Sequence, residues 1–368
     1  MIQRLYVHNF RCLENFELPL FGRSSVLLIG KNGAGKTTVA LALEILQKIA
    51  RGTNRVGDLI EKKDMARGRT DQPVRFEIEA KIGSRIFMYV IACDLPRDFK
   101  ELRVVEEKLS VDGSPVYERE LAQVHLARSR RDKAADFRID WHMAALPIIQ
   151  EESPDDPIFV FKQWLSRMLI LRPNPGMISG NSNDDTLLPD VQVSNFGAWF
   201  SGLLAYAPSA YSRIDAYLRQ VMPDLNDIRN PIVGKDSRSL EVQFSGAEAS
   251  VTIPFGDLSD GEKCFAVCAM VLAANVAYGP LVCFWDEPDN YLAPSEVGHF
   301  TLALRKAFQT GGQFIATSHN AETIRSFANE NTLVLFRENH LEPTRVRPLS
   351  EISFSGDLIS ALVRGDVG

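Results

Sequence analysis

The residues best suited to chemistry form a glycine-rich run, Gly30-Lys31-Asn32-Gly33-Ala34-Gly35-Lys36-Thr37. It has the spacing GxxxxGK[ST] and stands between an apolar run, Val26–Ile29, and a segment of helical periodicity that starts at Lys36. The glycines let successive backbone N–H groups turn toward a phosphate, and a helix N-terminus adds its dipole. The run therefore predicts a phosphate-binding loop. Lys36 is expected to reach the β- and γ-phosphates of a nucleotide, and the Thr37 hydroxyl to bind Mg²⁺.

Two adjacent carboxylates follow a second apolar run, Leu281–Trp285. A magnesium-nucleotide site needs a carboxylate at a strand end, so Asp286 is the candidate metal ligand beside Thr37. Glu287 comes next and is the candidate general base for the attacking water. An acidic strand end is common in α/β proteins, but its pairing with a phosphate loop favours the catalytic interpretation.

Two further runs lie on either side of these carboxylates in the chain. Leu258-Ser259-Asp260-Gly261-Glu262-Lys263 precedes them and opens a helical segment, and Thr317-Ser318-His319-Asn320 follows them. Alone, the first run is a capped helix start and His319 a structural histidine. Yet a serine hydroxyl can bind phosphate, a glycine permits close backbone approach, and a histidine at a strand end can sense a phosphate.

Taken together, the four runs resemble ABC-type ATPases of the RecF-like and SMC-like branch. Residues 258–263 resemble their signature loop in its S-x-G-E-K form, with Asp260 where LSGGQ has its middle glycine. Residues 286–292 resemble their Walker B and D-loop segment, His319 their switch histidine, and His8-Asn9-Phe10-Arg11 the N-F-R of that branch. The glutamine of the family stays open between Gln72 and Gln150.

The resemblance implies a set of site residues. Those assigned to the nucleotide are Gly30, Lys31, Asn32, Gly33, Ala34, Gly35, Lys36, Thr37, Thr38, Arg11, Ser259, Gly261, Glu262 and Asp289. Glu287, His319 and Lys36 are the catalytic candidates, and Thr37 and Asp286 the ligands of Mg²⁺. ATP and Mg²⁺ are therefore the expected substrate and cofactor, and the expected activity is hydrolysis of ATP to ADP and phosphate.

The resemblance also implies how such a protein acts. Two copies form a homodimer around ATP, each completing the other's site with Ser259 and Gly261, and hydrolysis by Glu287 opens the dimer. The chain is similar to stand-alone ATPases of the overcoming-lysogenisation-defect type, which implies a separate nuclease or toxin as effector in phage defence or DNA repair. The alternatives are the energising subunit of a membrane transporter and the nucleotide sensor of a toxin system.

Periodicity predicts an α/β fold, namely a P-loop ABC-ATPase head with a mixed sheet, a parallel core plus an antiparallel meander, and a helical lid insertion. Strands are expected over 2–8, 25–30, within 73–118, and at 240–244, 250–253, 281–286, 312–317 and 332–336; helices over 36–50, most of 120–170, 196–221, 261–278, 294–309 and 320–328. Residues 172–190 are expected to form a polar loop. The expected domains are 1–120, a mainly helical insertion at 121–254, and 255–368.

Composition adds weaker constraints. A net charge of −6 neither requires nor excludes DNA. The basic run 128–133, with Arg138, is a candidate contact for DNA or for an acidic partner, although such runs are more often solvated surface. The five cysteines show no metal-type spacing, which favours a reducing, cytoplasmic location. The uncharged run Cys264–Trp285 is long enough to span a bilayer, but Gly279-Pro280 and Asn275 argue for a buried helix and strand instead.

Overall fold

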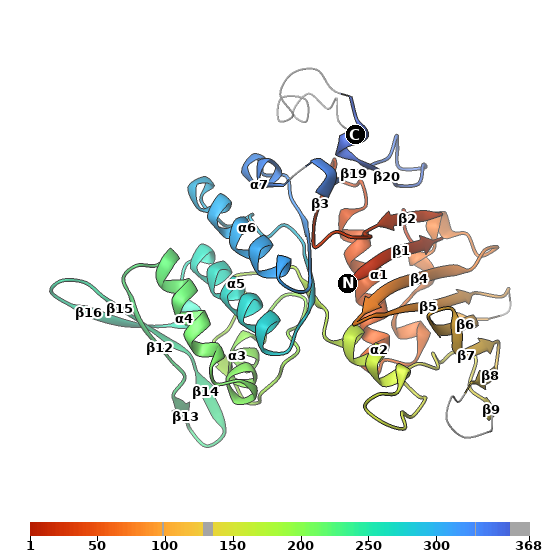
Figure 1. Ribbon diagram of the computed structural model, residues 1–368, viewed down its shortest axis with the longest axis horizontal. Coiled ribbons are helices and arrows are strands. Elements are labelled where there is room, and N and C mark those ends of the chain that lie inside the picture. Colours follow the sequence, from red (N-terminus) through yellow and green to blue (C-terminus); the bar gives the residue numbers. More distant parts are fainter. Residues whose placement is uncertain (98, 128–134, 328, 354–368) are drawn as a thin grey trace. The chain divides into compact units, whose positions relative to one another are not determined.

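A computed structural model describes residues 1–97, 99–127, 135–327 and 329–353 and divides the chain into two compact units (Figure 1). Unit 1 comprises Met1–Arg23, Leu28–Met168 and the residues from Asn329 onward, and unit 2 comprises Ser24–Leu27 and Leu169–Ala328. The predicted borders at 120/121 and 254/255 follow the motifs rather than these units and stay a prediction. The basic run 128–133 lies outside the described residues.

Unit 1 is built on an eight-stranded antiparallel sheet, drawn from red to olive in Figure 1, in the order β2-β1-β4-β5-β6-β7-β8-β9. The strands are β1 (Ile2–His8), β2 (Phe16–Pro19), β4 (Val74–Ile82), β5 (Arg85–Asp94), β6 (Arg103–Val111), β7 (Ser114–Glu120), β8 (Gln123–Leu126) and β9 (Ala135–Arg138). In β4, Val74, Phe76 and Ile78 are buried while Arg75 and Glu77 face the other side and pair at 2.6 Å. This period of two produces the expected meander.

The prediction that 120–170 is mostly helical was wrong. The segment holds β8, β9 and a loop before its only described helix, α2 (Pro157–Ser166). Strand β8 alternates, with Val124 and Leu126 buried, and so completes the sheet instead of forming a helix. Helix α2 begins only where Asp156 accepts a hydrogen bond from the Ile158 N–H at 2.8 Å, with a proline in its first turn.

One buried carboxylate ties the loop after β9 to the face of this sheet. Glu107 is fully buried and accepts hydrogen bonds from the Tyr89 and Tyr117 hydroxyls at 3.0 and 2.9 Å. It also accepts the backbone N–H groups of Ala145 and Leu146 at 2.6 and 2.9 Å. Burial and the nearby Glu107 raise the pKa of both tyrosines, so their hydroxyls stay donors. The carboxylate thus replaces water for two N–H groups that have no strand partner.

Glu107→Gln is expected to lower the free energy of unfolding by about 3–5 kcal/mol, since it leaves the buried Arg119 guanidinium, 3.4 Å away, without its counter-charge. Urea unfolding followed by circular dichroism at pH 7 measures the change. The matched control is Glu118→Gln on the neighbouring strand. Glu118 pairs with Lys108 at the surface, where an ion pair contributes about 1 kcal/mol or less. Equal effects of the two substitutions would contradict the role of Glu107.

The rest of unit 1 surrounds the glycine-rich run. It contains the end of β3 (Ser25–Ile29), α1 (Lys36–Ala50), β19 (Thr332–Phe336), β20 (Arg345–Pro348) and the short 3₁₀ turns η1 (Val56–Asp58), η2 (Lys62–Asp64), η3 (Ala66–Gly68), η5 (Asn329–Asn331) and η6 (Leu349–Glu351). Strand β19 pairs antiparallel with β20. Helix α1 buries Val39, Leu43 and Leu46, the helical spacing that the sequence shows, so α1 was predicted correctly.

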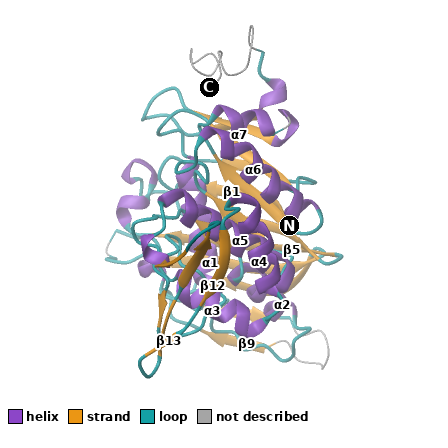
Figure 2. Ribbon diagram, turned by 90° about the vertical axis from the view of Figure 1, so that its left-hand side faces the viewer, coloured by secondary structure: helices purple, strands orange, loops and turns teal. Residues whose placement is uncertain are grey.

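Unit 2 has a parallel sheet of β10 (Leu169–Leu171), β17 (Val282–Trp285) and β18 (Gln313–Thr317). The whole six-stranded order is β10-β17-β18-β3-β19-β20, in which β3 is divided between the units. All four residues of β17 are buried, as expected for a strand covered on both faces. The helices of unit 2 are α3 (Phe196–Tyr206), α4 (Ala210–Val221), α5 (Asp260–Ala277), α6 (Pro294–Gln309) and α7 (Ala321–Ser326). Figure 2 shows α4 and α5 side by side. The predicted alternation of helix and strand after residue 260 is confirmed.

The uncharged run 264–285 forms most of α5 and then β17. Asn275 is the polar residue within it, and its amide nitrogen donates to the carbonyls of Ala307 and Gly311 at 3.3 and 2.9 Å, while its oxygen accepts from the Leu281 N–H at 2.9 Å. These bonds join the end of α5 to the start of β17 and to the end of α6 and the turn that follows it. Within the described ranges, the model contains no helix with the length and apolarity that a membrane span needs.

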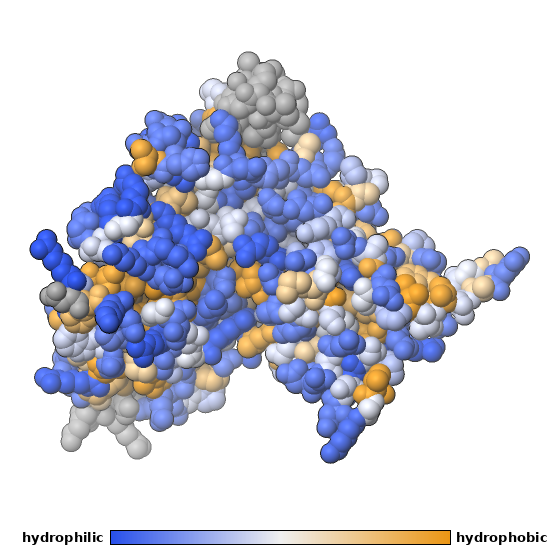
Figure 3. All heavy atoms as spheres, turned by 180° about the vertical axis from the view of Figure 1, so that it is seen from behind, coloured by the Kyte–Doolittle hydropathy of each residue, from blue (hydrophilic) through white to orange (hydrophobic). Residues whose placement is uncertain are grey.

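Two small antiparallel sheets complete unit 2. One has the order β11-β14-β13 and the other β12-β15-β16. Their strands are β11 (Asn181–Ser182), β12 (Leu225–Arg229), β13 (Ile232–Val233), β14 (Ser237–Ser239), β15 (Glu241–Ser245) and β16 (Ser250–Pro254), and the turn η4 (Phe255–Asp257) follows. The β15–β16 hairpin was predicted correctly. The hairpins β13–β14 and β15–β16 project from unit 2 in Figure 1, and Figure 3 shows hydrophilic residues at the ends of the projections.

Candidate functional site

The phosphate loop lies between β3 and α1 in unit 1, and its backbone requires glycine at two positions. Gly30 has φ 151°, and a Cβ there would stand 2.1 Å from the Leu335 carbonyl oxygen of β19. Gly35 has φ 103° as the N-cap of α1, and its Cβ would stand 2.8 Å from the Thr344 hydroxyl. A backbone carbonyl at Gly30 and neighbouring side chains at Gly35 fill the space that a Cβ would need, and both residues have a positive φ. The loop shape expected from the spacing is therefore built into the packing of unit 1.

Three side chains hold this loop from within unit 1. The buried Lys36 ammonium donates to the carbonyl oxygens of Gly30 and Lys31 at 2.7 and 3.3 Å. The Thr344 hydroxyl donates to the Ala34 carbonyl at 2.9 Å, and the Arg337 guanidinium donates to the Gly33 carbonyl at 3.3 Å. The loop carbonyls thus bond to side chains of unit 1. A loop held in this way is ordered before a phosphate arrives.

Residues 31–34 of the loop face a small cavity. Lys31 and Asn32 are exposed, Thr37 and Thr38 are half-buried, and α1 has no acidic residue in its first turn. A cavity of about 130 Å³ is lined by residues 31–34 on one side and by residues 336–340, which follow β19, on the other. The segment 336–340 was not singled out by the sequence, because it carries no recognisable motif and meets the loop only in the folded chain.

Arg11 and the two candidate glutamines lie elsewhere in unit 1. Arg11 has φ 52° and donates through Nε to the Asp64 carboxylate at 2.9 Å, with 44% of its side chain exposed. Gln72 Oε1 accepts a hydrogen bond from His8 Nε2 at 2.9 Å. Gln150 lines a separate cavity of about 370 Å³, whose other lining residues include parts of β5, β6, β7 and β8. The choice between the two glutamines therefore stays open.

In unit 2, a threonine joins the two candidate carboxylates at the ends of β17 and β18. The Thr317 hydroxyl donates to Asp286 Oδ1 at 2.6 Å and accepts the Glu287 N–H at 2.9 Å. Asp286 and Thr317 are both buried. Glu287 has φ 52°, the left-handed region, which costs a non-glycine residue on the order of 1–3 kcal/mol. Thr317 thus holds a strained backbone that turns Glu287 away from the path of β17.

Glu287 and His319, which lie far apart in sequence, meet at this edge. His319 Nε2 is 3.7 Å from Glu287 Oε1, and Asn290 donates to Glu287 Oε2 at 2.5 Å. The side chains of Glu287 and His319 are 36% and 44% exposed, so water reaches both. The predicted base and the predicted sensor are therefore neighbours. The sequence pointed to neither Thr317 nor Asn290 as a partner of Glu287, although both stand inside the runs that were singled out.

Asp289 is buried and bonds to hydroxyl groups of unit 2. It is 4% exposed and accepts hydrogen bonds from the hydroxyls of Ser318, at 2.5 Å, and Thr323. These bonds fix the segment after β17 to the end of β18 and to the first turns of α7. In the structure, Asp289 thus accepts its hydrogen bonds from protein hydroxyl groups. Its expected contact with nucleotide stays a prediction.

Ser259 and Glu262 form a capping box at the start of α5. The Ser259 Oγ accepts the Glu262 N–H at 3.3 Å, and Glu262 Oε2 accepts the Ser259 N–H at 2.7 Å. The serine oxygen accepts in this cap, and its hydroxyl can still donate to an anion. A Cβ on Gly261 would stand 3.2 Å from the Tyr291 carbonyl. The tip of α5 therefore packs against the segment that carries Asp289.

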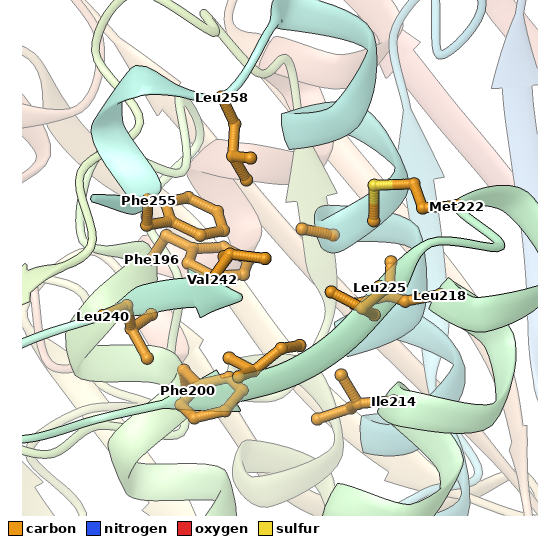
Figure 4. A pocket seen from close by; sticks show the side chains of 12 residues that line it. Phe196, Phe200, Ile214, Leu218, Met222, Leu225, Leu240, Val242, Phe255 and Leu258 are labelled. Atoms are coloured by element: carbon orange, nitrogen blue, oxygen red, sulfur yellow. The ribbon is translucent and has the colours of Figure 1, made fainter. Parts of the chain in front are cut away.

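The tip rests on an apolar layer, which Figure 4 shows as side chains converging from several elements. Leu258, which precedes Ser259, is 5% exposed and belongs to this layer. The lining residues are Phe196, Phe200, Ile214, Leu218, Met222, Leu225, Ile228, Leu240, Val242, Phe255, Leu258 and Ala266. The space between them is about 10 Å³, and its lining is wholly apolar, so it stays dry. The packing anchors the residue next to Ser259.

The cysteines differ in environment. Cys12 is half-buried, and its Sγ lies 3.5 Å from the Thr38 hydroxyl beside the phosphate loop. Cys93, Cys264, Cys268 and Cys283 are buried, and burial raises the pKa of Cys264 and Cys268 to about 12 and that of the other two as well. In the ranges that the structure describes, no three His, Cys, Asp or Glu side chains gather as a metal site.

Iodoacetamide at pH 8 is therefore expected to modify Cys12 at least about tenfold faster than the other four cysteines, because only a thiolate that reaches solvent reacts. Peptide mass spectrometry at successive times measures the rates. In urea all five should react at similar rates, which serves as the control. Modification of native Cys264 as fast as Cys12 would contradict the packing of α5.

Comparison with known proteins identifies relatives of this arrangement. The family model described as "AAA domain, putative AbiEii toxin, Type IV TA system" matches residues 25–325. The OLD nuclease of Thermus scotoductus (strain ATCC 700910 / SA-01) is 48% identical over 46 residues, which are 12% of this chain and 8% of that protein. The match thus spans less than a tenth of the curated relative.

Two solved structures share the fold. An SMC head bound to the C-winged helix domain of ScpA matches with a TM-score of 0.57 at 14% identity, over 98% of this chain and 99% of the other. An Smc head with an extended coiled coil, bound to the C-terminal domain of ScpA derived from Pyrococcus furiosus, matches with 0.53 at 13% identity, over 95% and 97%. The expected fold, an α/β ATPase head of the SMC-like type, is confirmed.

Proposed function

The chain belongs to this family of AAA ATPase domains, and on that basis we propose that it binds and hydrolyses ATP as a switch that dimerises around the nucleotide. The observation that carries the proposal is the group formed by Asp286, Glu287, Thr317 and His319. A strained glutamate at a strand end, held by a threonine and 3.7 Å from a histidine, suits the activation of water.

The phosphates of ATP are proposed to lie in the loop from Gly30 to Thr37. There the Lys36 ammonium donates hydrogen bonds to phosphate oxygens in place of the loop carbonyls that it contacts in the structure. The first N–H groups of α1 face the same anion. A hydroxyl and a carboxylate are oxygen ligands of the kind that Mg²⁺ prefers, so Thr37 and Asp286 fit the metal by their chemistry. When bound, Mg²⁺ neutralises charge on the phosphates.

Hydrolysis is proposed to begin at Glu287. Its Oε1 takes a proton from the attacking water, and the Asn290 amide holds Oε2 so that the other oxygen faces the solvent. His319 donates a hydrogen bond toward the γ-phosphate as charge develops there. Thr317 positions both carboxylates at once, because it bonds to Asp286 and to the backbone of Glu287.

The second half of each site is proposed to come from another copy. Ser259 is exposed at the start of α5, where a hydroxyl, a glycine and the positive end of a helix meet. Such a tip can hold the γ-phosphate that the partner binds, which gives a two-fold dimer whose contacts are the same on both sides. Glu262 supports the tip through the capping box, and Asp289 supports it through the neighbouring segment.

The switch is proposed to act in the cytoplasm on a separate effector, a nuclease or a toxin, in phage defence or DNA repair. Support comes from the toxin system in the family description and from the short match to an OLD nuclease. The test is the rate of ATP hydrolysis with linear DNA and with closed circular DNA of the same sequence, together with mass spectrometry of proteins that copurify from the native host. Linear DNA should raise the rate several-fold, and a nuclease or toxin should copurify. A flat rate and no such partner would contradict the effector role.

A further inference from the structure

The tip of α5 carries an excess of negative charge for a segment proposed to approach ATP. Asp257 and Asp260 are both exposed, and Glu262 follows within the first turn. A carboxylate close to a triphosphate is repelled by it, and the repulsion grows as water leaves the contact. Asp260 stands directly between Ser259 and Gly261, the two residues proposed to contact the γ-phosphate. A tip of this charge needs a cation on the opposing surface.

The cavity beside the phosphate loop offers such cations. Its lining contains two cations, Lys31 and Arg337, together with the His340 ring and a single carboxylate, Glu338. Lys31 is exposed, and among the described residues no carboxylate lies within ion-pair distance of it. His340 stands on the same rim, with Nε2 3.9 Å from the position of a Cβ on Gly33. At about 130 Å³ the cavity has room for one short carboxylate side chain.

We propose that the cavity formed by residues 31–34 and 336–340 receives the Asp260 carboxylate of a second copy, which pairs there with Lys31. The inference rests on the proposed ATP dimer and adds to it the residues that make two copies of this chain recognise each other. When Ser259 and Gly261 reach the phosphates held by the partner's loop, Asp260 between them is carried to the rim of that same loop. Asp260, which replaces the middle glycine of LSGGQ, then contributes to the specificity with which two copies of this chain bind each other.

The pairing predicts a rescue that only a direct contact gives. Glu287→Gln protein with ATP and Mg²⁺ serves as the dimeric parent, and sedimentation velocity gives its dissociation constant. Adding Asp260→Lys should raise that constant roughly 30-fold or more, and adding Lys31→Glu should do the same, because each homodimer then holds two like-charged pairs. An equimolar mixture of the two variants contains one native and one reversed pair per dimer. The dissociation constant of this mixed dimer should return to within about fivefold of the value for the parent.

Two controls distinguish the pairing of Asp260 with Lys31 from a general effect of charge on dimerisation and from a loss of nucleotide binding. Asp236→Lys, at the turn between β13 and β14, makes the same charge change and should leave the constant within about twofold. Binding of a fluorescent ATP analogue is measured for each variant. If Lys31→Glu loses the nucleotide, Lys31→Ala takes its place: it should raise the dissociation constant, and Asp260→Lys should raise that constant less in the Lys31→Ala background than in the parent.

Several results would overturn the pairing. One is an Asp260→Lys variant that dimerises as well as its parent; another is a mixture as weak as its components while both bind ATP. Either result would leave the proposed dimer intact. A Glu287→Gln parent that stays monomeric with ATP would instead overturn the dimer, and this pairing with it.

Discussion

Glu287→Gln is expected to slow ATP hydrolysis by roughly 10²–10³-fold, the usual contribution of a general base. The amide cannot take a proton from water, yet it has nearly the same shape and can still bond to Asn290. The affinity for ATP should change by less than about threefold, because Glu287 is not part of the phosphate loop. The ATP-bound dimer should therefore persist, and it should appear in light scattering as a doubling of mass that remains for the whole measurement.

The measurement needs a control that changes charge without touching the site. Glu118→Gln is suited to this, since it removes a surface carboxylate of β7 that belongs neither to the phosphate loop nor to the group around Glu287. It should keep hydrolysis within about twofold of the parent. If Glu287→Gln stays monomeric with ATP, the model of a site completed by a second copy is wrong. If the variant hydrolyses ATP normally, another group acts as the base.

Lys36→Ala is expected to weaken ATP binding by roughly 100-fold or more and to remove hydrolysis and dimerisation with it. The substitution deletes the charge that meets the phosphates, and a charge-assisted hydrogen bond in a partly buried site contributes strongly to binding. It also releases the Gly30 and Lys31 carbonyls from the ammonium that holds them. Isothermal titration with ATP and Mg²⁺ measures the loss.

Lys48→Ala is the matched control, because Lys48 is on the same helix, half exposed and paired only with Glu44. It should bind ATP within about twofold of the parent and unfold at nearly the same temperature. Circular dichroism must show that Lys36→Ala is folded. A folded Lys36→Ala protein with unchanged affinity for ATP would mean that the glycine-rich run is not the nucleotide site.

Local patterns explain which parts of the fold could be predicted from the sequence. Helix α6 has the predicted bounds, because a proline at its first position and regular apolar spacing define it within its own residues. The meander followed from alternation and from turns such as Gly83. The parallel strands followed from short apolar runs between helices. Each of these signals depends on neighbours in the chain, which a sequence displays directly.

The errors and omissions depend on contacts between distant residues. The short strands β8 and β9 exist because the open edge of β7 pairs with β8, and β8 in turn pairs with β9. With four residues each, they are too short for their alternation to identify them in the sequence. The bonds from Ser318 and Thr323 to Asp289 likewise join residues 29 and 34 positions apart, and no local pattern shows that they meet. The left-handed backbone of Glu287 could not be foreseen, because glutamate has no preference for it and only Thr317 and the packing impose it.

The hydrogen bonds from Arg337 and Thr344 to the phosphate loop limit how far this chain can be shortened from its C-terminal side. The match to the family model ends at residue 325, and a fragment that starts at Met1 and stops there would keep every recognised motif. It would lose strand β19, on which Gly30 rests, and both side chains that hold the loop carbonyls. The shortest fragment that retains nucleotide affinity is thus set by hydrogen bonding, and it extends at least to Thr344.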